Sequence, residues 1–162
     1  MFRIKPTQEP DSVVRAKNYI FKLLGRRFYS RNELIQRLKR KGFNDQVCRQ
    51  VMELVTEYGY IDDTELAKRE LEQCLQRKKL GPNRIKLRLQ KRGIAPEIIC
   101  EIMDSLNTDA VYRLCFELAR SKLADMSDPN PYKRQARLSS FLFRRGFEPD
   151  CIKQCLRELI DV

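Results

Sequence analysis

Apolar residues recur along the chain every three or four positions, with polar residues between them. Leu34 and Leu38 are one helical turn apart, and Val47, Val51 and Val55 repeat this spacing further on. Such spacing places apolar side chains on one face of an α-helix, which then packs against its neighbours. The pattern therefore predicts an all-α fold.

A pattern of two helices around a Gly turn occurs three times, at offsets of 51 and 53 residues. The stretches are ELIQRLKRKGFNDQVCRQVMELV from Glu33, RIKLRLQKRGIAPEIICEIMDSL from Arg84 and RLSSFLFRRGFEPDCIKQCLREL from Arg137. The Gly lies where a helix C-cap favours the left-handed conformation. A further helical stretch precedes each pair, over residues 11–30, 62–82 and 108–125. The sequence therefore predicts nine helices in three tandem units.

The alignment pairs equivalent positions in the three units. The Gly turn contains Gly42, Gly93 and Gly146. The following helix has Val47, Ile98 and Cys151 at one apolar position, and Val51, Ile102 and Cys155 one turn later. Cys151 and Cys155 are therefore predicted to be core residues.

The repeat also predicts the domain organisation. We expect a flexible N-terminal segment over 1–10, and three-helix repeats over 11–58, 59–106 and 107–162. Because a unit of this size buries too small a core to be stable alone, the units should stack into an elongated array.

Two adjacent carboxylates, Asp62 and Asp63, begin the second unit just after Gly59. Asp62 is placed to cap a helix, with Glu65 three residues on as the other half of a capping box. Asp63 then falls in the first turn, where a carboxylate favours the helix dipole. Because neighbouring helical positions point about 100° apart, the pair is poorly placed to share a metal ion. We interpret it as a helix start and not as a catalytic or metal-binding pair.

The composition excludes several classes of function and indicates the kind of partner. The 162 residues carry a net charge of +11, which predicts an acidic partner such as nucleic acid or a protein bound to it. There is no His, which excludes His-dependent nucleophiles and imidazole metal ligands. The six cysteines include no C-x-x-C pair, so we expect reduced structural thiols, with no metal and no cofactor. No apolar run or secretory signal stands out, which favours a cytoplasmic protein without membrane contact.

Charge separates by helix. The second helices carry net charges of +4 (Ser30–Lys41), +5 (Asn83–Arg92) and +5 (Tyr132–Arg145). The third helices are expected to be acidic, with net charges of −2 over Asn44–Tyr58 and −3 over Ala95–Leu106. Stacked units would align the second helices into a basic surface suited to an acidic filament or a phosphate backbone. The alternative to a binding surface is a solvated face, on which the cations of the last turn only interact favourably with the negative end of the helix dipole.

The predicted binding residues of this surface are Arg37, Arg40, Lys41, Arg88, Lys91, Arg92, Arg144 and Arg145. Arg40, Lys91 and Arg144 are equivalent and point away from the apolar stripe, so they are the preferred surface contacts. In unit three Phe141 and Phe143 accompany them, either as core between units, which we favour, or as an apolar contact for a partner.

Three motifs, in this order, resemble the RecX family of bacterial regulatory proteins: GYIDD at 59–63, GPNRIKLRLQKRGI at 81–94 and FLFRRGF at 141–147. The resemblance extends from about Asp11 to the C-terminus. The motif residues interpreted as structural are Gly59, Tyr60, Asp62, Asp63, Gly81, Pro82, Gly93 and Gly146. The chain departs from the family at SKLADMSDPNP, where a Lys-Tyr-Gly stretch is common, so the role of the 126–133 connection stays open.

The resemblance implies a cytosolic, non-enzymatic protein of three tandem three-helix repeats. It implies binding along the RecA–DNA filament, with modulation, mostly inhibition, of filament growth and ATPase in recombination and DNA repair. We expect a monomer that has RecA as its partner, with direct contact to single- or double-stranded DNA left open. The alternative is a helix-turn-helix transcriptional regulator, which the acidic helices after the Gly turns disfavour.

Overall fold

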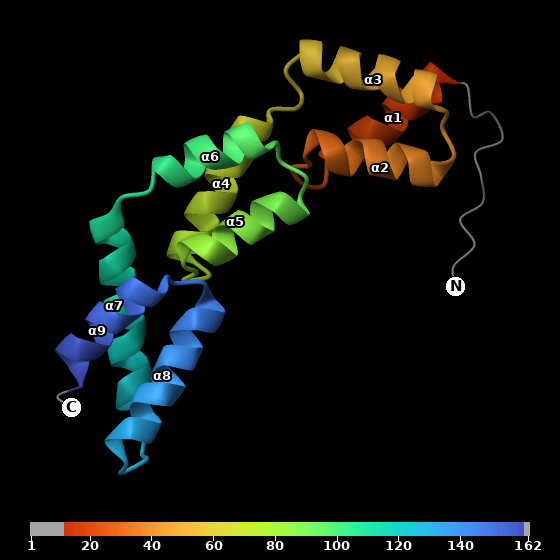
Figure 1. Ribbon diagram of the computed structural model, residues 1–162. Coiled ribbons are helices and arrows are strands. Elements are labelled where there is room, and N and C mark those ends of the chain that lie inside the picture. Colours follow the sequence, from red (N-terminus) through yellow and green to blue (C-terminus); the bar gives the residue numbers. More distant parts are fainter. Residues whose placement is uncertain (1–11, 161–162) are drawn as a thin grey trace.

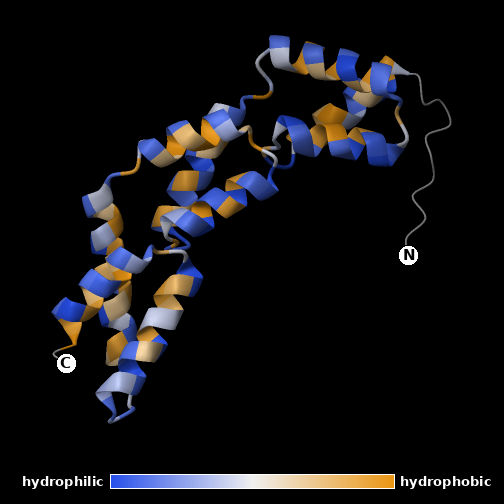
Figure 2. Ribbon diagram, in the orientation of Figure 1, coloured by the Kyte–Doolittle hydropathy of each residue, from blue (hydrophilic) through white to orange (hydrophobic). Residues whose placement is uncertain are grey.

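The computed structural model describes residues 12–160, and this part of the chain forms nine α-helices (Figure 1). Their bounds are α1 Val13–Leu24, α2 Arg31–Lys41, α3 Asp45–Glu57, α4 Asp63–Gln76, α5 Pro82–Lys91, α6 Pro96–Asp104, α7 Thr108–Ala124, α8 Pro131–Arg145 and α9 Pro149–Leu159. The all-α prediction is confirmed. Figure 2 shows apolar and polar residues alternating along the helices, as expected for helices with one buried face.

Local sequence sets the helix ends as predicted. Ser12 caps α1, and Asn44 caps α3 by accepting a hydrogen bond from the backbone N–H of Val47. After α2 and α8 the chain turns through Gly42 and Gly146, whose φ values of 96° and 91° favour Gly over any residue with a Cβ.

Each group of three helices surrounds its own apolar core. Leu34, Leu38 and Val51 are fully buried in the first, Ile85 and Leu89 in the second, and Leu138, Leu142 and Phe147 in the third. The helix pairs that pack most extensively all lie within one unit. The three apolar cores form separate clusters, and hydrogen bonds and an ion pair connect one unit to the next.

The units follow one another in a curved, elongated array (Figure 1). The second helices α2, α5 and α8 lie along the inner side of the curve, and the third helices α3, α6 and α9 along the outer side. Among the residues described, no helix has the length and apolar character needed to cross a membrane.

Candidate partner-binding surface

The second helices join end to end, through backbone groups at one junction and through a side-chain hydroxyl at the other. At the junction between units two and three, the N–H of Gly81 donates to the carbonyl of Arg145 (2.9 Å), and the N–H of Asn83 donates to the carbonyl of Gly146 (3.0 Å). At the junction between units one and two, the Ser30 hydroxyl donates to the carbonyl of Arg92. The last carbonyls of one helix thus meet the first donors of the next, which pairs opposite ends of their dipoles.

Glycines allow this close approach. A Cβ on Gly81 would lie 2.5 Å from the backbone of Gly146 and Phe147, and a Cβ on Gly146 would lie 2.4 Å from the N atom of Arg84. A Cβ on Gly93 would collide with the Asn32 side chain. The second helices can abut only because these positions carry no side chain.

A charged network fixes the junction between units one and two. The Arg92 guanidinium donates to the carbonyl of Phe28 (2.8 Å) and to the carboxylates of Glu33 (3.0 Å) and Glu70 (3.2 Å). Arg88 and Lys78 also bind Glu70, at 2.7 Å and 3.1 Å. Every member of the network therefore has a partner, as a buried charge requires.

The network controls the ionisation of its carboxylates. Burial alone would raise the pKa of Glu70, which is only 6% exposed, but hydrogen bonds from Arg88 and Lys78 outweigh burial and lower the pKa to about 2. Burial likewise opposes the hydrogen bonds from Arg92 and from the Ser30 N–H that lower the pKa of Glu33. Both groups are therefore carboxylates at neutral pH.

The Asp62–Asp63 pair has two structural roles. Asp62 caps α4 by accepting from the N–H of Glu65 (2.9 Å), as predicted. The Glu65 carboxylate pairs with Arg69, and not with the Asp62 backbone as a complete capping box requires. Asp63 accepts from the N–H of Arg31 (2.9 Å), so it caps α2 of the preceding unit. Burial raises the pKa of Asp63 despite this bond. No motif near Asp63 indicates this contact between units.

Three of the predicted binding residues form a surface series that we call the basic ridge: Arg40, Lys91 and Arg144. All three side chains are exposed. Each lies in the last turn of its second helix, and Lys91 and Arg144 are next to Arg92 and Arg145, which make the two junctions. Within residues 12–160, Lys91 and Arg144 have no ion pair, and the Arg40 Nε donates to the Gln36 carbonyl of its own helix (3.3 Å). The ridge therefore places one exposed cation in the last turn of each of α2, α5 and α8, the helices along the inner side of the curve (Figure 1).

The other predicted binding residues lie differently. Arg88 and Arg92 both bind the Glu70 carboxylate beside the junction between units one and two. Arg145 donates to the carbonyl of Lys78 (2.7 Å) across the junction between units two and three. Arg37 lies over the Tyr29 ring, with its guanidinium carbon 5.0 Å from the ring centroid, and Lys41 is exposed. Arg92 and Arg145 thus connect units and Arg88 connects α5 to α4 within unit two, which leaves less of their charge for a partner.

The structure adds a feature that the helix-by-helix reading missed. A groove of about 500 Å³ lies beside the first junction. The residues that line it include Arg27, Arg69, Arg77 and Phe28. Phe28 is 60% exposed, and the guanidinium carbon of Arg69 lies 4.3 Å from the centroid of its ring. The signal is the basic and aromatic run GRRFYS at 25–30, which was predicted to end the first helical stretch but follows α1 as a connection to α2.

Two expectations for unit three need correction. The helix after its Gly turn is not acidic, because α9 carries Asp150 and Glu158 against Lys153 and Arg157. The reversal of sign between second and third helices is therefore confined to units one and two, whereas in unit three a basic α8 precedes an α9 without net charge. Phe143 is not core between units, since it is 63% exposed beside Arg144, whereas Phe141 packs against the core of its own unit.

The fold and this surface define an all-α tandem-repeat protein with a basic inner side. The sequence models of the first, second and third three-helix domains of RecX match residues 16–53, 62–103 and 109–156. The regulatory protein RecX of Pelodictyon phaeoclathratiforme is 32% identical over 145 residues, which cover 90% of this chain and 89% of that protein. The one of Clostridium perfringens is 25% identical over 158 residues, 96% of this chain and 74% of that protein.

Solved structures agree on the fold. The crystal structure of RecX from Lactobacillus salivarius superposes with a TM-score of 0.83 at 20% identity, over 91% of this chain and 96% of that one. A second crystal structure of regulatory protein RecX superposes with a TM-score of 0.81 at 15% identity, over 88% of this chain and 72% of that one. The chain belongs to the RecX family of regulatory proteins.

Proposed function

We propose that this protein binds the RecA–DNA filament in the cytoplasm through its basic inner side and inhibits filament growth and ATPase. The observation that carries the proposal is the end-to-end joining of α2, α5 and α8. This joining gives the basic ridge a fixed order along the inside of the curve. A cation repeated once per unit suits a partner whose negative charge also repeats along an axis.

The proposed mechanism is occupancy. One elongated molecule contacts several positions of the filament at once, so the contacts add and the filament is held in the state that fits the curve. Inhibition follows if that state disfavours the addition of further RecA or the turnover of ATP. A monomer suffices, because the three units already supply repeated contacts.

A helix-turn-helix regulator is the alternative, and the arrangement supports it less well. In that class the helix after the turn carries base-reading groups into the major groove. Here α3, α6 and α9 lie on the outer side, and α3 and α6 carry net negative charge. The basic residues belong instead to the helices before the turn.

The direct test measures ATP hydrolysis by RecA filaments on single-stranded DNA as the protein is added, with binding to naked DNA followed in parallel. The proposal predicts that hydrolysis falls at protein concentrations below those needed to coat naked DNA. Unchanged hydrolysis, or hydrolysis that falls only as naked DNA becomes saturated, would refute filament binding and point to simple competition for DNA.

A further inference from the structure

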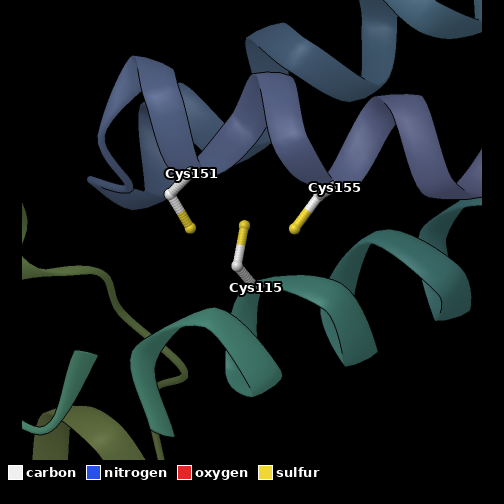
Figure 3. Close-up of side chains that lie close together, drawn as sticks. All are labelled: Cys115, Cys151 and Cys155. Atoms are coloured by element: carbon white, nitrogen blue, oxygen red, sulfur yellow. The ribbon is translucent and has the colours of Figure 1, made fainter. Parts of the chain in front are cut away.

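Three cysteine sulfurs lie together in unit three. Cys115 comes from α7, and Cys151 and Cys155 come from successive turns of α9 (Figure 3). The three Sγ atoms all lie within 4.8 Å of one another, and Cys115 points between the other two. The sequence has no C-x-x-C pair, since three residues separate Cys151 from Cys155, and the third thiol belongs to a helix that precedes the other two by more than thirty residues.

Packing alone does not call for sulfur at these positions. At the positions of Cys151 and Cys155, unit one has Val47 and Val51 and unit two has Ile98 and Ile102. Branched hydrocarbon side chains therefore fill the same place in the two sister units. Unit three replaces both with thiols and places them against a third.

We propose that Cys115, Cys151 and Cys155 form a three-thiolate binding site for a divalent d10 metal ion of the zinc class. Thiolates about 2.3 Å from a zinc ion lie about 3.8 Å apart, so sulfurs already within 4.8 Å need to shift by only about 1 Å or less. Water completes the four-coordinate shell.

The charge balance selects the ion. Binding exchanges three thiol protons for the metal, so Zn²⁺ leaves a net charge of −1 on the site, whereas Cu⁺ leaves −2. Because Cys115 and Cys155 are buried, the smaller residual charge is favoured.

The site has an entrance. Cys151 is half-buried and lines a groove of about 570 Å³ between units two and three, together with Lys86 of α5 and Tyr112 of α7. An ion can therefore reach the cluster without unfolding the unit. Once bound, it links α7 to α9 and stabilises unit three against unfolding.

The test is a titration of the reduced, metal-free full chain with Cd²⁺, followed by thiolate-to-metal charge-transfer absorption. The site predicts an end point at one equivalent, displacement by Zn²⁺, and a melting temperature that rises with Zn²⁺. Cys151→Val and Cys155→Val copy the residues of unit one, so they should melt cooperatively and lose the end point. Cys48→Val, which changes a buried cysteine outside the cluster, is the matched control and should retain the end point at one equivalent of Cd²⁺.

Absence of charge-transfer absorption at one equivalent in the folded wild type would overturn the proposal, as would an end point that survives both cluster substitutions. If a variant fails to fold, alkylation of the wild-type protein with and without Zn²⁺ still tests the site. Zn²⁺ must then slow alkylation of Cys151 and leave that of the exposed Cys100 unchanged, and equal rates with and without Zn²⁺ would reject the site.

Discussion

Replacing Arg92 with Ala tests how the array is held together. The side chain donates to the Phe28 carbonyl and to the carboxylates of Glu33 and Glu70, and it is 17% exposed. Leaving a buried charge without a partner costs about 3–5 kcal/mol. Here both carboxylates keep other donors, since Glu70 retains Arg88 and Glu33 retains the Ser30 N–H. The expected cost is therefore smaller, about 2 kcal/mol, close to that of a hydrogen bond to a charged group.

The assay is urea unfolding at neutral pH, followed by far-ultraviolet circular dichroism. Arg92→Ala should lower the free energy of unfolding and broaden the transition, because unit one then unfolds apart from unit two. Arg92→Lys should recover only part of the loss, since one ammonium group cannot hold three acceptors in the fixed geometry of a guanidinium. The matched control is Lys91→Ala, an exposed neighbour on the same helix, which should stay within about 0.5 kcal/mol of wild type. Equal stability of Arg92→Ala and Lys91→Ala would refute the network as the link between units.

Further predictions concern the pH dependence, the glycine contact and the helix cap. Because the folded-state pKa of Glu70 is lowered from 4.5 to about 2, its ion pairs stabilise the fold above pH 4.5, and this contribution is lost as the pH falls toward 2; thermal melts across that window should show the loss, and Glu70→Gln should remove much of this pH dependence. Gly81→Ala should disrupt the junction between units two and three, because the added Cβ would collide with the backbone of Gly146. In the control Gly59→Ala the added Cβ meets no atom within 4 Å, so the only cost is the strain of a positive φ. Small-angle scattering should show a changed curvature for the first variant and not for the second. Asp62→Ala should cost about 0.5–2 kcal/mol of stability and Asp62→Ser almost nothing, and a melting temperature that falls on adding chelator to a variant without the three clustered cysteines would contradict the capping role.

Much of the fold could be predicted because local signals repeat. The Leu34–Leu38 stripe and the Gly42 turn recur at fixed offsets, and each determines a helix face or a helix end without help from distant residues. The same reasoning predicted that Arg40 and its equivalents are exposed, because the direction of a helical side chain follows from its spacing to the apolar stripe.

The junctions could not be predicted, because they depend on which ends meet. Nothing near Asp63 in the sequence shows that it caps a helix of the preceding unit, and nothing near Arg92 shows that it reaches Glu33. The same holds for Cys115, which approaches Cys155 only once α7 and α9 have packed. Contacts of this kind follow from tertiary packing, and counts of charge by helix treat Arg92 and Lys91 alike although one is largely buried and the other exposed.

The most direct test of the proposed function reverses the basic ridge. Arg40→Glu, Lys91→Glu and Arg144→Glu in one chain should leave circular dichroism and stability near wild type, because all three side chains are exposed. The matched control is Lys17→Glu, Lys68→Glu and Arg113→Glu, which changes three exposed cations on the first helices by the same total charge.

The measurement is binding to preformed RecA–single-stranded DNA filaments at moderate and raised salt concentrations. The proposal predicts that the ridge variant loses most of its binding, that the control variant keeps most of it, and that wild-type binding weakens as salt rises, since exposed charges are screened beyond about 8–10 Å. A folded ridge variant that binds and inhibits the filament as the wild type does, or a control variant that loses as much binding as the ridge variant, would contradict the proposal.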